Sequence, residues 1–481
     1  MGYLEKAKQN GIESNIIAYK PEMLQKLAEL VAIPSLPTYT TPDGIPMGPE
    51  VIRALHYALE LSEQLGFRVH NEDDKYGWAE VGESGPLVCI FTHLDIVPVG
   101  DNWTKEPFVV SEEDGWLYGR GILDNKGPAI ASLYALKVCC DQNIDWPCRI
   151  RVWFGTNEEN GMNDVQMYIH KYGAPDYSFV PDSQFPLSYS ELGTSHFVIR
   201  KNYLPQNVQA PVQLVSFRVK PHANVVPPLV HVTLRAQSQP MAEEICRKLA
   251  AFAEQKQYAM SAECDGCEVT VESRGHVADH WNEPWTAVNA LAQLVVFLDT
   301  LDLGEEPGKL IHFVASKIGT DTDGKKLGID ATTETASLAV AMESAALDEF
   351  GLSFDFFVIA PAEIRCEVML DTILRQLRSD GMDLVVRSLG PGFLRDKDMP
   401  LLRLLYESYS DVTGNTDPIK VCGGTYAKFV PNAIPFGAIF SAQKDICHTP
   451  NERIEVEDLL SWTKIYSNAL LRIADYISQQ T

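Results

Sequence analysis

Histidine and carboxylate side chains follow two of the strand-like, apolar runs in this sequence. His93-Leu94-Asp95 comes directly after the run L-V-C-I-F-T, and the adjacent acids Glu158 and Glu159 come shortly after the run R-I-R-V-W-F. In open α/β sheets the working site lies at the carboxyl ends of the strands. We therefore expect these side chains to lie together at one edge of a sheet.

Three further groups of the same kind follow or precede other elements. Asp182 comes after the run Y-S-F-V, Asp124 lies in a glycine-rich turn just before an apolar helix, and His448 follows the run F-G-A-I-F-S. Each position alone has an ordinary explanation, such as a hydrogen-bonded surface pair or a helix cap. Together, two histidines and three carboxylates match the ligand set of a site for two metal ions.

Imidazole and carboxylate ligands suit Zn²⁺, and also Mn²⁺ or Co²⁺. One bridging carboxylate can hold two ions about 3.5–4 Å apart and position a shared water. A metal ion would also explain why Glu158 and Glu159 are adjacent. One acid would bind the ion, and its neighbour would be free to take a proton from the water. Residues i and i+2 of an extended chain face the same way, so Asp95 is expected to orient the imidazole of His93.

The surrounding elements predict an α/β domain that is interrupted by an inserted α+β domain. Residues 1–192 alternate strand-like and helical segments, and residues 393–481 return to that pattern. Residues 193–392 contain strand-like runs and two helical segments, Met241–Gln255 and Trp285–Thr300. In the last part, Phe436–Ser441 is expected to be a buried strand and Asp458–Ile477 a long helix.

Composition excludes several classes of partner. Lys and Arg total 40 and Asp and Glu total 65, which gives a formal net charge of −25. That charge argues against nucleic acid or an anionic membrane as a partner. The polar N-terminus and the lack of a run of 18 apolar residues predict a cytoplasmic protein without a membrane span. Ten cysteines are too sparse for a disulfide scaffold in 481 residues, and the single C-x-x-C lacks the second pair of a zinc site.

Six segments, in this order over nearly the whole chain, resemble one family of enzymes. They are F-T-H-L-D-I-V-P-V-G, Y-G-R-G-I-L-D-N-K-G-P, G-T-N-E-E-N-G, P-D-S-Q-F-P, C-G-G-T-Y-A-K and C-H-T-P-N-E. The family is the dipeptidase V-like (Xaa-His dipeptidase type) metallopeptidases, relatives of aminoacylases and glutamate carboxypeptidases. The resemblance implies a di-metal, aminopeptidase-like catalytic domain with a mixed sheet flanked by helices, and an inserted α+β lid domain.

The resemblance also implies a role for each residue of the candidate site. Glu158 would be the general base and then the acid, and Asp95 would orient His93. The five metal ligands would be His93 and Asp182 for one ion, Glu159 and His448 for the other, and Asp124 as the bridge between them.

Further residues of the resembling segments would contact substrate. Asn224 lies in a segment similar to the family's N-x-V-P. His280 matches the lid histidine that polarises the scissile carbonyl. The following Trp281 departs from the family's small residues, and His276 remains a rival for that role.

Two more segments are expected to contact the substrate. Arg365 resembles the arginine that grips the substrate carboxylate, a task that suits its bidentate fork, although a surface ion pair is the alternative. Gly423, Gly424 and Thr425 would offer backbone N–H groups close to the substrate, where glycine permits close approach.

The resulting hypothesis is hydrolysis of dipeptides with a free amino terminus, by a metal-bridging water that Glu158 activates. The alternative within the family is an N-acyl amino acid amidohydrolase or a carboxypeptidase. A third hypothesis is a non-catalytic metal-binding or scaffold protein. The protein is expected to be a monomer or a homodimer.

Overall fold

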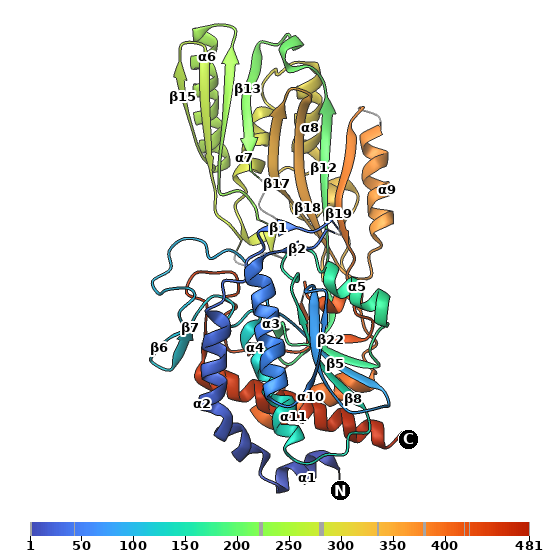
Figure 1. Ribbon diagram of the computed structural model, residues 1–481. Coiled ribbons are helices and arrows are strands. Elements are labelled where there is room, and N and C mark those ends of the chain that lie inside the picture. Colours follow the sequence, from blue (N-terminus) through green and yellow to red (C-terminus); the bar gives the residue numbers. More distant parts are fainter. Residues whose placement is uncertain are drawn as a thin grey trace. The chain divides into compact units, whose positions relative to one another are not determined.

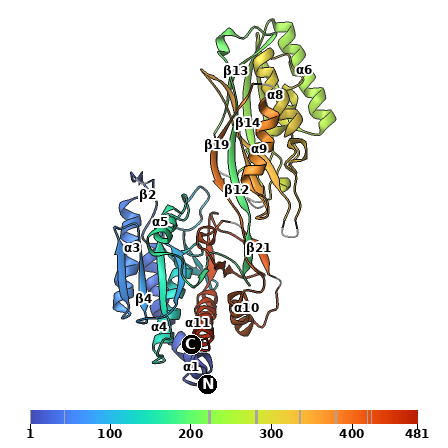
Figure 2. The ribbon, with the colours of Figure 1, turned by 90° about the vertical axis from the view of Figure 1, so that its right-hand side faces the viewer.

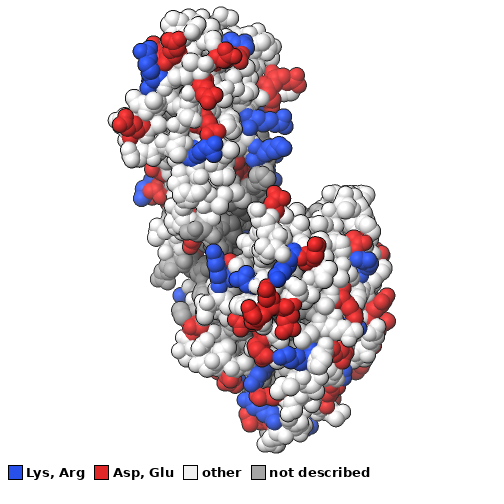
Figure 3. All heavy atoms as spheres, turned by 90° about the vertical axis from the view of Figure 1, so that its left-hand side faces the viewer, with Lys and Arg blue, Asp and Glu red and all other residues white. Residues whose placement is uncertain are grey.

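The computed structural model describes residues 2–42, 44–220, 225–278, 283–333, 336–378, 381–417, 419–422 and 424–480. The chain forms two compact units (Figure 1). The first unit combines Met1–Ser190 with Arg395–Thr481, and the second is Glu191–Leu394. Acidic and basic side chains are interspersed over both units on the face drawn in Figure 3.

A six-stranded mixed sheet forms the centre of the first unit. Its strand order is β22-β9-β5-β8-β4-β3, in which β22, β9, β5 and β8 are parallel and β4 and β3 are antiparallel to their neighbours. The run L-V-C-I-F-T explains the central position of β5, because a strand covered on both faces needs apolar residues throughout. The strands are β3 (Arg68–Glu72), β4 (Tyr76–Val81), β5 (Leu87–His93), β8 (Arg149–Gly155), β9 (Tyr177–Val180) and β22 (Ala433–Pro435).

Helices cover this sheet and continue its core. Helix α4 packs between α2 and α11, and α3 packs on β3 and β4. Helix α10 packs on α11 (Figure 2). None of the helices in the described part of the chain is long and apolar enough to cross a membrane. The helices of this unit are α1 (Tyr3–Gln9), α2 (Ile12–Val31), α3 (Pro49–Gln64), α4 (Lys126–Cys140), α5 (Asn163–Tyr172), α10 (Pro400–Thr413) and α11 (Val456–Ser478).

Short strands complete the first unit. Strands β6 (Ser111–Glu113), β7 (Trp116–Tyr118) and β24 (Arg453–Glu455) form an antiparallel sheet, with β7 in the middle. The others are β1 (Tyr39–Thr40), β2 (Pro46–Met47), β10 (Ser183–Gln184), β11 (Ser188–Glu191), β21 (Lys420–Cys422) and β23 (Ala438–Ile439), with the 3-10 helix η5 (Tyr426–Lys428).

The second unit is built on an eight-stranded antiparallel sheet with the order β15-β16-β14-β13-β17-β18-β12-β19. Alternation along β14 explains its burial, because Val230, Val232 and Leu234 are buried whereas His231 and Arg235 are exposed. The strands are β12 (Gly193–Asn202), β13 (Val212–Val219), β14 (Leu229–Ala236), β15 (Ala259–Asp265), β16 (Glu268–Arg274), β17 (Ala339–Asp348), β18 (Gly351–Ala360) and β19 (Asp383–Gly390).

Helices pack against this sheet and form an apolar core with it. They are α6 (Gln239–Lys256), α7 (Ala290–Leu298), α8 (Glu305–Lys317) and α9 (Cys366–Leu377), with the 3-10 helices η1 (Pro205–Asn207), η2 (Pro284–Thr286) and η3 (Lys325–Leu327). The two-residue strand β20 (Phe393–Leu394) ends the unit.

Two elements differ from the sequence-based expectation. The helix expected over Trp285–Thr300 begins only at Ala290, because the side chain of Asn289 accepts a hydrogen bond from the Ala292 N–H and caps the helix there. The strand expected over Phe436–Ser441 is interrupted at Gly437, whose φ of 76° is incompatible with an extended strand. Its pairing segments are β22, which ends before Phe436, and β23.

Candidate metal centre

His93 is the last residue of β5, and its side chain is buried. The ring Nδ1 lies 3.0 Å from the backbone carbonyl oxygen of Asp95, and Nε2 lies 3.0 Å from Oδ1 of Asp124. Donation from Nδ1–H to a carbonyl orients the ring and leaves Nε2 facing the carboxylates. Nε2 is therefore the atom of His93 that can bind a metal.

Asp124 lies between two imidazoles. Its Oδ1 is 3.0 Å from Nε2 of His93, and its Oδ2 is 3.0 Å from Nε2 of His448. Two atoms bound tetrahedrally to one ion at about 2.1 Å are about 3.4 Å apart, so both spacings are close to those of shared ligands. Asp124 ends the turn before α4, and the Asp124–Asn125 peptide bond is cis.

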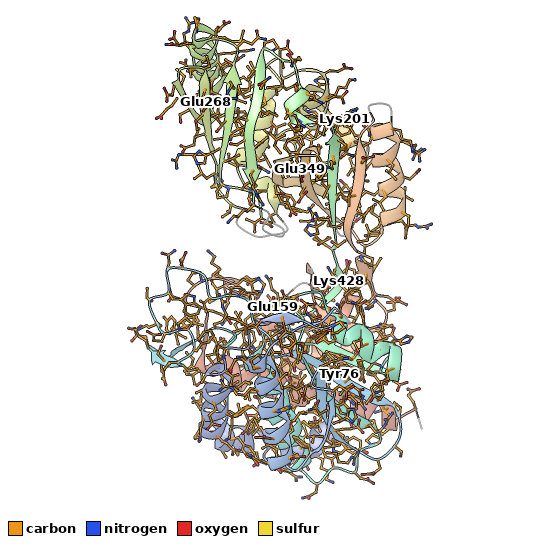
Figure 4. All side chains as sticks on the ribbon, turned by 45° about the horizontal axis from the view of Figure 1, so that its top comes forward. Tyr76, Glu159, Lys201, Glu268, Glu349 and Lys428 are labelled. Atoms are coloured by element: carbon orange, nitrogen blue, oxygen red, sulfur yellow. The ribbon has the colours of Figure 1, made fainter. Side chains whose placement is uncertain are left out.

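The other two predicted ligands lie on opposite sides of Asp124. Oδ2 of Asp182 is 3.6 Å from Nε2 of His93, and Oε2 of Glu159 is 3.1 Å from Nε2 of His448. Donor atoms of His93, Asp124 and Glu159 all lie within 4.8 Å of one another, as do those of His93, Glu158 and Asp182. The structure thus brings all five predicted ligands and Glu158 together. Figure 4 labels Glu159 in the first unit.

The carboxylate of Asp95 holds the turn that carries the two adjacent glutamates. Oδ1 accepts a hydrogen bond from the Glu158 N–H and Oδ2 from the Glu159 N–H, both at 3.1 Å. Oδ1 also lies 3.5 Å from Nδ1 of His93, farther than the 3.0 Å to the backbone carbonyl oxygen. Asp95 therefore lies against His93 with both its backbone carbonyl and its carboxylate, and the orienting role expected for it stays a prediction.

A second buried acid, Asp164, holds the residues just before the glutamates. Its Oδ2 accepts hydrogen bonds from the N–H groups of Thr156 and Asn157, at 2.8 and 3.0 Å, and from the hydroxyl of Tyr426 at 2.7 Å. Asp164 was not among the residues expected at the site. An acid in the first turn of a helix is common because it interacts favourably with the helix dipole. Its sequence position therefore gives no sign of its contacts with distant residues.

The cluster concentrates negative charge in a buried place. Burial, with the charge of Asp182 next, raises the pKa of Glu158 well above its ordinary value, and burial raises the pKa of Glu159 to about 7. Burial opposes protonation of His93, but its hydrogen bonds with Asp124 and Asp182 outweigh this and raise its pKa well above the ordinary value. These directions are those of a site that needs positive charge.

The residues present fit divalent metal ions. Oε1 of Glu158 and Oε1 of Glu159 are buried and have no hydrogen-bond partner among the described residues. Leaving such atoms unpaired costs free energy, and a bound ion can supply the missing partner. Four neighbouring carboxylates, Asp124, Glu158, Glu159 and Asp182, carry up to four negative charges, which two divalent cations can balance.

The predicted substrate contacts of the second unit are described in part. Arg365 precedes α9 with 77% of its side chain exposed, and its Nε lies 3.6 Å from Oε2 of Glu367. His276 is exposed, and its Nε2 lies 3.1 Å from the carbonyl oxygen of Thr286. Asn224 and His280 lie outside the described residues.

The segment C-G-G-T-Y-A-K is described except for Gly423, which lies outside the described residues. Gly424 has a φ of 95°, a conformation that favours glycine. Thr425 is buried and accepts a hydrogen bond from the Ala427 N–H, which caps η5. Because Tyr426 bonds to Asp164, this segment is connected to the turn that carries Glu158.

Residues 89–472 match the model of peptidase family M20/M25/M40. The chain belongs to this family. It is therefore a metallopeptidase, and the family resemblance of its motifs is confirmed. Membership also implies metal dependence.

Relatives match over nearly the full length. A protein of Staphylococcus aureus (strain USA300), described as "Putative dipeptidase", is 29% identical over 465 residues, which cover 94% of this chain and 97% of the relative. One of Staphylococcus haemolyticus (strain JCSC1435), with the same description, is 27% identical over 463 residues, with the same coverage of both chains.

Solved structures share the fold at low sequence identity. Human carnosine dipeptidase 1 has a TM-score of 0.59 at 19% identity, and the dipeptidase Dug1p of Saccharomyces cerevisiae has a TM-score of 0.58 at 15% identity. Each comparison covers 98% of this chain and 99% of the other. The α/β fold class, with a mixed catalytic sheet and a separate antiparallel-sheet unit, is confirmed.

Proposed function

We propose that this protein is a di-metal dipeptidase that hydrolyses dipeptides with a free amino terminus. One observation carries the proposal: Asp124 presents one carboxylate oxygen to His93 and the other to His448, each at 3.0 Å. A carboxylate placed in this way can be shared by two ions. His93 and Asp182 would hold one Zn²⁺, Mn²⁺ or Co²⁺ ion, and Glu159 and His448 the other.

When bound, the two ions would act as Lewis acids toward the scissile carbonyl and lower the pKa of a nearby water. Glu158 supplies the proton transfer. Its buried carboxylate has a raised pKa and an oxygen with no hydrogen-bond partner in the described part of the chain, which suits a group that first takes a proton from the attacking water and then gives it to the leaving amine. Asp95 fixes the backbone of Glu158 through the hydrogen bond at 3.1 Å, so the base keeps its position during both transfers.

The second unit would supply the lid. We assign Arg365 to the substrate carboxylate, which its exposed guanidinium can bind bidentately. Asn224 and His280 are assigned to the substrate backbone, and Gly423, Gly424 and Thr425 to its binding through N–H groups. The descriptions of the staphylococcal relatives and of the two solved structures as dipeptidases support a dipeptide as substrate.

Metal removal and substrate comparison test this function. We expect the chelated protein to be inactive, and refilling with Mn²⁺ or Zn²⁺ to two ions per chain to restore hydrolysis of free dipeptides. N-acetylated dipeptides serve as the matched control and should be poor substrates, because they lack the free amine. A preference for the capped compounds would favour an amidohydrolase, and a metal-replete protein that is inert on both sets would favour a non-catalytic role.

A further inference from the structure

Arg120 and Glu452 form an ion pair behind the candidate metal centre. Nη1 of Arg120 lies 2.7 Å from Oε2 of Glu452, and the two side chains are 1% and 0% exposed. Removing both charges from water is costly unless the remaining lone pairs and protons are also hydrogen-bonded. The partners of this pair therefore indicate what its burial achieves.

The carboxylate of Glu452 accepts backbone hydrogen bonds from a single turn. Oε2 accepts from the Gly121 N–H at 3.0 Å, and Oε1 accepts from the N–H groups of Leu123 and Asp124 at 2.8 and 3.1 Å. This turn joins β7 to α4 and carries the carboxylate that lies between the two imidazoles. Glu452 thus fixes the backbone of Asp124 directly.

The same residue fixes the course of the loop that carries His448. The carbonyl oxygen of Glu452 accepts a hydrogen bond from the Gly119 N–H at 3.0 Å, and the next residues pair with β7 as strand β24. His448 lies four residues earlier, on a loop where its φ is 62° and its side chain is 54% exposed. Its position therefore depends on where the loop is attached as well as on the contacts of its Nε2 with Asp124 and Glu159.

Arg120 extends the connection to a third loop. Its Nη2 donates to the carbonyl oxygens of Pro98 and Val99, both at 3.3 Å, and its guanidinium lies 5.3 Å from the ring centre of Trp103. These residues follow His93 on the loop that leaves β5. The pair consequently touches the three segments that carry His93, Asp124 and His448.

We propose that Arg120 and Glu452 are positioning residues that set the spacing between Asp124 and the two histidines, and thereby the affinity of the site for divalent ions. The proposal rests on the metal-binding function proposed above. Neither residue is assigned a contact with substrate. Hydrogen bonds that orient metal ligands from outside typically contribute 10–100-fold to metal affinity or activity.

Glu80 provides a matched control within the same unit. Its Oε2 pairs with Arg151 at 2.9 Å to Nε, and the side chains of Arg151 and Glu80 are 7% and 14% exposed. This pair joins β4 to β8, and among the described residues its hydrogen bonds reach none of the turns that carry the proposed ligands. Glu80→Gln therefore removes a largely buried ion pair without loosening those turns.

The experiment compares Glu452→Gln with Glu80→Gln in the full chain. Mn²⁺ binding to the metal-free proteins is measured by calorimetric titration, and the fold is checked by thermal unfolding in the absence of metal. We expect Glu452→Gln to weaken Mn²⁺ binding by about 10–100-fold and Glu80→Gln to leave it unchanged. Raising the Mn²⁺ concentration should restore most of kcat for Glu452→Gln, since the ligands themselves are intact.

Wild-type Mn²⁺ affinity in folded Glu452→Gln would overturn the proposal, and so would an equal loss in both variants. If Glu452→Gln does not fold, Arg120→Lys carries the test, because it keeps the charge but loses the fork that reaches both Glu452 and the carbonyl groups. Unchanged affinity in that variant would also overturn it. A wild-type protein that binds Mn²⁺ but cleaves no dipeptide would reject the proposed function and leave this inference standing.

Discussion

The carboxyl end of the six-stranded sheet and the core of the second unit are both buried. The first is rich in carboxylate side chains, whereas the second consists of apolar ones. At the sheet end, Glu158 and its neighbouring carboxylates lie close together, and Asp95, Asp164 and Glu452 hold the surrounding turns through backbone N–H groups. On β18, apolar side chains such as Phe354 and Phe356 face the helices.

The comparison indicates that the second unit gains stability from its core, whereas the carboxylate cluster of the first unit costs stability. Apolar burial on β18 stabilises the second unit in proportion to the area removed from water. Buried carboxylates that lie close together destabilise the first unit unless cations balance them, and strongly shifted pKa values such as that of Glu158 are typical of functional sites. Substitutions in the two regions should therefore separate activity from stability.

The largest effect is expected for Glu158→Gln. Loss of the proposed general base should lower kcat by about 10²–10⁴-fold. The variant should keep its metal and unfold at about the same temperature, because Oε1 of Glu158 has no hydrogen-bond partner among the described residues that the change would break. Steady-state kinetics, metal analysis and thermal unfolding check the three parts, and near-normal turnover would contradict the assignment. Glu159→Gln is the neighbouring control, and it should lose both activity and bound metal.

In the second unit, Phe356→Ala should lower stability and leave activity unchanged. The side chain is fully buried and its ring centre lies 5.5 Å from that of Phe197. Its truncation should lower the free energy of unfolding by about 3–5 kcal/mol, measured by urea denaturation, while kcat/KM of the folded protein stays unchanged. Phe350→Ala, at a ring that is 60% exposed, is the control and should change stability by about 0.5 kcal/mol or less. Equal effects of both substitutions would contradict the comparison.

A smaller effect, dependent on pH, is expected at Asp164. Burial raises its pKa from 3.8 to about 6, so the folded protein binds the proton more tightly than the unfolded chain. Its contribution to stability is therefore present below pH 3.8 and is lost as the pH rises through 6. Between pH 4 and pH 8 the loss amounts to about 2 kcal/mol.

Asp164→Asn should remove this pH dependence. Urea denaturation of the metal-free wild type and variant at pH 4 and pH 8 measures it, since the proposed metal ligands titrate equally in both proteins. The difference in unfolding free energy between the two should shift by about 2 kcal/mol in favour of the variant at the higher pH. Parallel pH profiles would show that the carboxyl group of Asp164 does not titrate in this range.

The sequence predicted correctly that side chains at the carboxyl ends of strands would lie together. His93 and Asp182 follow apolar runs that became parallel neighbours, so simple topology brings them to one edge. The fold class and the family followed from the same runs and motifs, and both are confirmed. The roles of the individual site residues remain predictions.

The supporting hydrogen bonds could not be predicted, because they join distant parts of the chain. Tyr426 and Asp164 are 262 residues apart, and Leu123 and Glu452 are 329 apart, so no local pattern records either pair. Asn289 is a different case. It is a typical residue for the start of a helix, and its position before A-L-A-Q-L was a readable sign that the helix begins there.

The first unit is assembled from two stretches of chain that are separated by the second unit, and this affects the order in which the units can fold during synthesis. Strand β22, helices α10 and α11, and His448 all come from the stretch that follows residue 394. Domains fold as units while the ribosome delivers the chain from its N-terminus, so the second unit can fold before the first is complete. The nascent protein then carries a finished insert while the catalytic sheet still lacks β22. The proposed shared metal site would remain one imidazole short until the segment that carries His448 has been made.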